Sequence, residues 1–265
     1  MFNITCDPES HLGCQNESLE TIAAKVGKKN DVQINIKIPQ LKLNAKVSFT
    51  NLSSLTINGT PGLTTIACKD DGKANPGIVM SDVVDKITLT NLNITLCGSL
   101  IYDIGKHGAT YSSALIIDHC RIVELYGLVI TRNRGLGLML LNHQGGRVNI
   151  RSTYFGYNKL PPKYINNNET ILGGGGIYIR LAHLPHIRNS CMTFQFDNCT
   201  FENNIAHTKH NKNFYTDTLG MADEGQGRGG GVYILLKSGL TDVNISFLGP
   251  VNFITVWAAT QTNFS

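Results

Sequence analysis

Asparagine is the residue type in this chain whose spacing most clearly suggests chemistry. Nine asparagines stand in Asn-x-Ser or Asn-x-Thr, the acceptor signal for N-linked glycans. With 26 Asn and 37 Ser plus Thr in 265 residues, chance predicts about four such sites. The excess indicates glycosylation in a secretory compartment, although Asn and Thr are also common in tight turns. The predicted acceptors are Asn3, Asn16, Asn51, Asn58, Asn93, Asn168, Asn198, Asn244 and Asn263.

Cysteine is the second informative residue type. The chain has seven cysteines, an odd number, so one thiol stays free or pairs elsewhere. No Cys-x-x-Cys pair is present, which argues against a zinc ribbon or a thioredoxin-like site. Alternatively, the cysteines are buried free thiols that fill gaps in a core. The candidate disulfides are Cys6 with Cys14, Cys191 with Cys199, and Cys97 with Cys120.

Acidic and histidine side chains do not form an arrangement typical of catalysis or metal binding. Two close acid pairs could serve a glycosidase, but both lie in stretches typical of turns, at residues 70–71 and 82–85. The two His-x-x-His pairs fall in expected loops and lack a helix that would aim both rings at one ion. These pairs are His183 with His186 and His207 with His210. We therefore predict no catalytic residue, no metal ligand and no cofactor.

Composition excludes several classes of protein. With 16% charged and 42% hydrophobic residues, the chain is neither a disordered tail nor a coiled coil. The net charge of +4 comes from scattered Lys and Arg, so we expect no nucleic-acid partner. No stretch approaches the about 18 apolar residues of a membrane-spanning segment. No signal peptide is visible at the N-terminus, which suggests a fragment or a chain whose true start lies upstream.

The secondary structure expected to position these residues changes near residue 30, from a helix to strands. Apolar residues from Leu19 to Val26 recur at helical spacing and Gly27 ends the pattern, which predicts one short helix. After Asp31 the apolar residues alternate with a period of two, as in strands. Where this parity switches, at Thr90 and Asn91, we expect the chain to turn a corner. We predict an N-terminal cap at residues 1–46, followed by a β domain at residues 47–265 that continues beyond the C-terminus.

An internal repeat defines the architecture of this β domain. Residues 148–158 align with residues 194–204 at a constant offset of 46, and apolar positions match apolar ones. An earlier copy ends at Asn133, and each copy finishes as Ile or Phe, two residues, then Asn. Parallel stacking of such copies would place Asn133, Asn158 and Asn204 above one another in a hydrogen-bonded ladder. We therefore predict an all-β fold, a right-handed parallel β-helix solenoid with a short N-terminal helical cap. An antiparallel sandwich remains the alternative.

These repeats resemble a known group of proteins. The Phe-x-x-Asn copies followed by Gly-Gly and Ile or Val look like the repeat of the chlamydial polymorphic outer membrane proteins. More broadly they resemble the right-handed parallel β-helix proteins of the pectin-lyase-like superfamily. Motif order over residues 14–256 is also similar to uncharacterised extracellular β-helix proteins of simple animals. The resemblance implies surface exposure and adhesion or binding.

One segment resembles the active site of an enzyme with this fold. Ile-Ile-Asp-His-Cys at residues 116–120 is similar to a pectate lyase segment whose Asp helps to bind Ca²⁺. Calcium prefers about six to eight oxygen ligands, and Asp103, Asp118 and Glu124 are the only acids near this segment. The basic motif of that family is also absent. A carbohydrate-active enzyme, a polysaccharide lyase or a glycoside hydrolase, therefore remains the alternative function.

Two long inserts indicate where a partner could bind. Residues 159–172 and 205–226 interrupt the same corner of the repeat, and they carry Tyr164, Phe214 and Tyr215 among polar residues. This mixture suits a glycan or an extracellular protein as partner. We predict an extracellular or cell-surface binding or adhesion scaffold.

Overall fold

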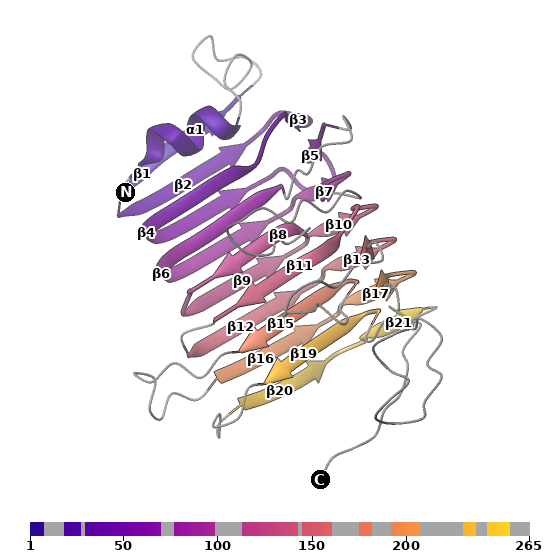
Figure 1. Cartoon of the computed structure of the whole chain (residues 1–265). Helices are drawn as coiled ribbons and strands as arrows, with labels where there is room; N and C mark the ends of the chain where they lie inside the picture. The colour runs from indigo at the N-terminus through magenta and orange to yellow at the C-terminus, as the bar shows by residue number, and fades with distance from the viewer. Residues whose placement is uncertain are drawn as a thin grey trace, which may run out of the picture.

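Parallel strands build nearly all of the described part of the molecule (Figure 1). The structure is a computed structural model of the whole chain. It describes residues 1–7, 19–27, 30–69, 77–98, 113–142, 145–160, 175–181, 192–206, 230–236 and 243–254. Every strand pairing in these ranges is parallel, which makes the antiparallel sandwich wrong and confirms an all-β fold with parallel sheets.

Strand pairing divides the strands into three columns, which we number in the order in which the chain visits them. The first column belongs to the twelve-stranded sheet. It contains the first halves of β4 (Val47–Asn58) and β6 (Ile78–Thr90), then β8 (Ser113–Asp118), β11 (Leu136–Leu141), β15 (Ile177–Leu181) and β19 (Val232–Leu236).

The second column belongs to the same sheet, because β4 and β6 run through both columns. It contains β1 (Phe2–Cys6), β2 (Asp31–Ile36), the second halves of β4 and β6, β9 (Ile122–Tyr126), β12 (Gly146–Arg151), β16 (Met192–Asp197) and β20 (Val243–Leu248).

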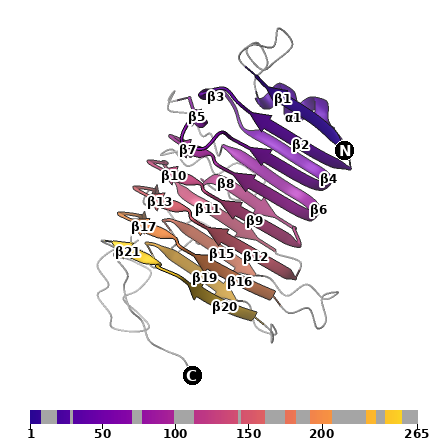
Figure 2. The same ribbon diagram turned by 180° about the vertical axis from the view of Figure 1, so that it is seen from behind.

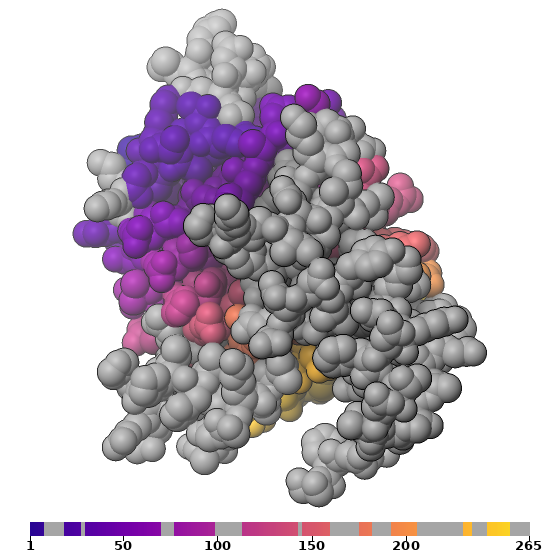
Figure 3. Space-filling model, in the orientation of Figure 1, coloured from indigo at the N-terminus to yellow at the C-terminus, as the bar shows by residue number. Residues whose placement is uncertain are grey.

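The third column is the separate seven-stranded sheet. It contains β3 (Gln40–Leu43), β5 (Thr65–Cys68), β7 (Asn93–Thr95), β10 (Val129–Thr131), β13 (Tyr154–Gly156), β17 (Thr200–Glu202) and β21 (Asn252–Ile254). The short β14 (Lys159–Leu160) and β18 (Ile205–Ala206) pair with each other outside the columns. From β4 onward the chain visits first, second and third column in the same order, so successive strands stack in chain order (Figure 2). In the space-filling view, the colour of the described residues accordingly runs from indigo to yellow along the molecule (Figure 3).

The core lies on the inner side of all three columns and follows from the period-two pattern. In the second column Leu55, Ile87, Val123, Val148 and Phe194 stand in register and are fully buried. Burial of each such side chain contributes about 2 kcal/mol. Because all strands run parallel, each inner position repeats directly above its equivalent, and this repetition selects one register.

Corners between the columns use residues in the left-handed region of backbone space. Asn51 and Asp82 have φ values of 57° and 55° where β4 and β6 bend from the first column to the second. Asn91 has a φ of 54° directly after β6, which confirms the corner predicted from the change of parity. Asn and Asp tolerate this conformation better than most residues, because their short side chains bond to the local backbone.

One helix covers the N-terminal end of the described stack. In α1 (Leu19–Val26) the side chains of Leu19, Ile22 and Val26 are buried, as the helical spacing predicts. Glu20 Oε1 accepts hydrogen bonds from the backbone N–H groups of Asn44 and Ala45, at 2.8 and 3.1 Å, and so joins the helix to the segment before β4. The segment predicted as a cap holds β1, β2 and β3 as well as this helix.

The disulfides differ from two of the predicted pairs. Cys97 bonds to Cys68, with Cα atoms 4.9 Å apart, rather than to Cys120. Cys68 is the last residue of β5, and Cys97 lies two residues after the end of β7, on the next turn of the third column. Because β5 and β7 are paired neighbours, the strand spacing itself brings the two cysteines together. Cys120 and Cys199 are buried free thiols, so the pairing of Cys199 with Cys191 is also wrong. Cys6 is disulfide-bonded, while Cys14 and Cys191 lie outside the described residues.

Candidate binding face

The outer sides of the three columns differ in their exposure to solvent. In the first column the outer residues Ile116, Met139 and Tyr178 stand in register, and all three are buried. Tyr178 also stacks on Tyr233, with ring centroids 5.8 Å apart. This outer side is therefore a second apolar cluster. Solvent reaches the outer sides of the second and third columns.

The outer side of the second column is the longest polar surface of the described stack, and we call it the outer face. Its central row places one outward side chain from every strand in register, at a spacing of about 4.8 Å. Seven of these eight side chains are uncharged and polar. The row consists of Asn3, Gln33, Thr56, Thr88, Glu124, Asn149, Gln195 and Ser246.

The one charge in this row is balanced on both sides. Glu124 Oε2 lies 2.7 Å from Lys86 Nζ, and Glu124 Oε1 lies 2.9 Å from the Arg147 guanidinium. The hydrogen bond from Lys86 and the two positive charges lower the pKa of the Glu124 carboxyl. The carboxylate is thus held ionised between two cations from neighbouring strands, and it offsets one of their two positive charges.

Toward the N-terminal end, polar side chains of the outer face bond to one another. Asn58 Nδ2 donates to Asn35 Oδ1 at 3.0 Å, and Asn58 Oδ1 accepts from Thr90 Oγ1 at 2.8 Å. Gln33 Nε2 donates to Asn35 Oδ1 at 3.1 Å. These amides form a ladder across the strands and have fewer groups left for a ligand.

Toward the middle, the face keeps unused polar groups. In the described part of the chain, no side-chain hydrogen bond engages Thr88, Asn149 or Gln195, although all three are half-buried. Tyr126 stands in the neighbouring outward row and is 52% exposed. Amide and hydroxyl groups that donate and accept therefore lie in register beside an exposed aromatic ring.

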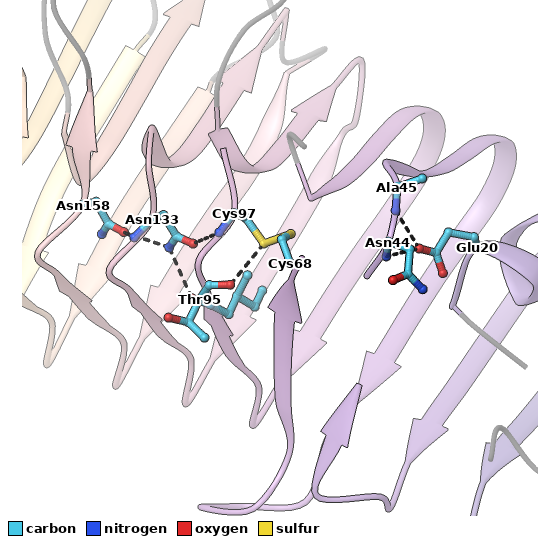
Figure 4. The surroundings of a disulfide bond; sticks show 9 residues. Glu20, Asn44, Ala45, Cys68, Thr95, Cys97, Asn133 and Asn158 are labelled. Carbon is cyan, nitrogen blue, oxygen red and sulfur yellow. Dashed lines mark hydrogen bonds between the residues drawn. A yellow bond between two sulfur atoms is a disulfide. The ribbon is translucent and has the colours of Figure 1, made fainter. Parts of the chain in front are cut away.

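A buried column of asparagines supports the corner between the third and the first column (Figure 4). Asn133, Asn158 and Asn204 lie in one hydrogen-bonded column: Asn133 Nδ2 donates to Asn158 Oδ1 at 2.8 Å, and Asn158 Nδ2 donates to Asn204 Oδ1 at 2.9 Å. Asn133 Oδ1 in turn accepts from the backbone N–H of Cys97 at 3.0 Å. The disulfide thus stands at one end of the ladder, and together they fix the spacing of successive turns.

The Ile-Ile-Asp-His-Cys segment at residues 116–120 forms a different cluster, at the corner between the first and second columns. His119 Nδ1 lies 2.9 Å from Asp118 Oδ1 and 3.9 Å from Asp82 Oδ1, and Asn142 Nδ2 donates to Asp118 Oδ1 at 3.0 Å. Glu124 is engaged with Lys86 and Arg147 instead, and Asp103 lies outside the described residues. Within the described ranges, no three His, Cys, Asp or Glu side chains converge as metal ligands would.

A second polar cluster, on the outer side of the third column, was not predicted. The hydroxyls of Tyr154 and Tyr157 donate to the two oxygens of Glu202, at 2.9 and 2.8 Å. Burial and the neighbouring Glu202 carboxylate raise the pKa of Tyr154 to about 12. The donors already satisfy the carboxylate, so this cluster stabilises the outer side of β13 and β17. Only the strand register, which pairs Gly156 with Glu202, could have revealed it.

Six of the predicted glycan acceptors lie in the described part of the chain. Asn3, Asn51, Asn198 and Asn244 are exposed, whereas Asn58 and Asn93 are half-buried. Several other predicted positions lie outside the described residues. They are Asn16, Asn168, Asn263, Asp70, Asp71, the four histidines of the His-x-x-His pairs, and Tyr164, Phe214 and Tyr215 of the inserts.

Comparisons with known proteins return no relative. No family model matches the chain, and neither a curated protein nor a solved structure is significantly similar to it. In the described ranges, no helix has both the length and the apolar character needed to cross a membrane.

Proposed function

We propose that this chain is a right-handed parallel β-helix that serves as a binding or adhesion scaffold outside the cell. The repeated visiting order of the three columns supports a single coil. Connections between parallel strands are right-handed in nearly all proteins, which supports the hand. The Phe-x-x-Asn repeats resemble those of chlamydial polymorphic outer membrane proteins and of the pectin-lyase-like superfamily, whose members share this coil.

The observation that carries the binding function is the middle of the outer face. Thr88, Asn149 and Gln195 offer hydrogen-bonding groups that no described residue uses. They stand in one row, in which Asn149 and Gln195 are on neighbouring turns and Glu124 separates Thr88 from Asn149. A rigid array of this kind meets a ligand with little loss of conformational entropy. The ligand we propose is a glycan, because its hydroxyls match amides and hydroxyls, while the exposed Tyr126 ring suits the apolar face of a sugar.

Two further observations support the extracellular location and the class of ligand. The Cys68–Cys97 disulfide is of a kind that persists in oxidising compartments. Glu124 offsets one of the two positive charges of Lys86 and Arg147, and the face lacks the positive stripe that a nucleic acid requires. An extracellular protein with a neutral polar surface is the other partner that this face could accept.

The test is a glycan array probed with the full chain and two matched variants. The face variant changes Thr88, Asn149 and Gln195 to Ala. The control variant changes Thr131, Asn252 and Gln40 to Ala, the same residue types at outward positions of the third column. We expect array signals that the face variant loses and the control keeps. Equal loss in both variants, or no signal from the array, would refute glycan binding by this face.

The enzyme alternative is tested in the same samples. Among the residues that the structure describes, the His119–Asp118 pair is the arrangement that could act as a general base. Incubation with uronate and neutral polysaccharides, followed by reducing-sugar and unsaturated-product assays, should show no turnover. Turnover that His119→Ala abolishes would replace the scaffold proposal with a carbohydrate-active enzyme.

A further inference from the structure

Predicted glycan acceptors in the described part of the chain fall into two groups with different surroundings. We infer that N-linked glycans occupy Asn3, Asn51, Asn198 and Asn244 and are absent from Asn58 and Asn93. The inference rests on the proposed extracellular location. In this modification, the side-chain Nδ2 forms a bond to the anomeric carbon of an oligosaccharide. The donor is a lipid pyrophosphate-linked sugar, whose anomeric C–O bond breaks as the amide loses a proton.

The four exposed acceptors lie on the borders of the outer face. Asn3 is on β1 and Asn244 on β20, the two end strands of the described second column. Asn51 is at the corner from the first column, and Asn198 at the corner to the third. Only Asn198 among them has a side-chain hydrogen bond in the described ranges, a long one of 3.4 Å to Ser152 Oγ. A sugar can therefore extend into solvent from each position.

The other two acceptors are held inside strand-to-strand ladders. Asn58 uses Nδ2 and Oδ1 to bridge Asn35 and Thr90, as described above. Asn93 Nδ2 donates to Thr65 Oγ1 at 3.3 Å, and Asn93 Oδ1 is buried. A glycosidic bond would replace one Nδ2 hydrogen and force a sugar between neighbouring strands. Because glycans are added before folding, a chain modified there could not complete the ladder, and folded secreted molecules should lack it.

This placement has a consequence for the outer face itself. Glycans on its four borders leave the central Thr88, Asn149 and Gln195 uncovered. Those on Asn3 and Asn244 stand on the two end strands of the described second column. The glycans would therefore frame the binding surface.

The experiment uses the full chain, fused behind a secretion signal and expressed in glycosylating eukaryotic cells. Site occupancy in the folded, secreted protein is mapped by mass spectrometry of peptides before and after enzymatic release of N-glycans. Each Asn→Gln change is also made singly, and the gel mobility of the product is compared with that of the wild type.

We expect glycans on most molecules at Asn3, Asn51, Asn198 and Asn244. Each of N3Q, N51Q, N198Q and N244Q should increase mobility by one step, whereas N58Q and N93Q should not. Glycans at Asn58 or Asn93, or an empty site among the four, would overturn the inference. The map is independent of ligand binding, so a negative glycan array combined with the expected map would refute the proposed function alone.

Discussion

Individual side chains in this protein divide into those that join turns and those that face outward. Asn158 is fully buried and bonds to both neighbouring turns and to the Ile130 carbonyl, so each of its polar atoms has a partner. Asn149 is half-exposed, and no described residue bonds to its side chain. Residues of one type therefore contribute very differently to stability, according to the direction in which they point.

Asn158→Ala should lower the free energy of unfolding by about 3 kcal/mol, because it leaves buried polar groups of Asn133, Asn204 and Ile130 without their hydrogen-bond partner. Asn149→Ala is the matched control and should change it by less than about 0.5 kcal/mol. Urea unfolding followed by circular dichroism measures both. Equal effects of the two changes would show that the buried column does not hold the turns together.

The Cys120 thiol should make stability depend on alkaline pH. Burial raises the pKa of Cys120 from 9.0 to about 11. The unfolded chain therefore loses this proton first, and the stability present below pH 9 is lost as the pH rises toward 11. Over this range the wild type should lose about 2–3 kcal/mol relative to Cys120→Ala. Chemical unfolding at several pH values checks this, and parallel pH profiles for the two proteins would contradict it.

Among the elements of the fold, the corners and turns restrict the type of residue most strictly. Gly77 and Gly62 both have positive φ, +73° and +68°, but their surroundings differ. A Cβ atom on Gly77 would collide with the Ala114 carbonyl oxygen on the next turn, whereas one on Gly62 meets nothing within 4 Å. Close approach of neighbouring turns, and not φ alone, therefore requires glycine at position 77.

Substitution of these two glycines separates the two effects. Gly62→Ala should cost about 1 kcal/mol, the strain of a side chain in the left-handed region. Gly77→Ala should cost about 3 kcal/mol, because the strand beside it must also move. Thermal unfolding of both variants makes the comparison. A Gly77→Ala protein as stable as Gly62→Ala would mean that the turns are not packed as closely as described.

The same elements show what the sequence could predict. The constant offset of 46 residues was sufficient to align Asn158 with Asn204, because the chain between them makes one turn. The Cys68–Cys97 pair spans 29 residues, and turn length varies with each insert, so no single period could find it. Corners at Leu96, Arg132 and Tyr157 were equally hidden, because these residue types rarely adopt positive φ. The contact of Tyr154 and Tyr157 with Glu202 could be predicted only from the strand register, which the sequence does not show.

For the molecule as a whole, the stack leaves one broad polar surface for a partner. The middle strands of the first column are buried on both sides, and the strands of the third column are only three or four residues long. The outer face of the second column combines length, regular spacing and unused polar groups, and we therefore propose it as the binding surface. Glycans at its borders would then limit access to its centre.

The most direct measurement is a crystal structure of the full chain bound to the strongest glycan found on the array. We predict ligand density over the middle of the outer face, with hydrogen bonds to Thr88, Asn149 and Gln195 and a sugar ring against Tyr126. A ligand seated beside His119 at the first corner, or on the Tyr154 and Tyr157 side of the third column, would contradict it.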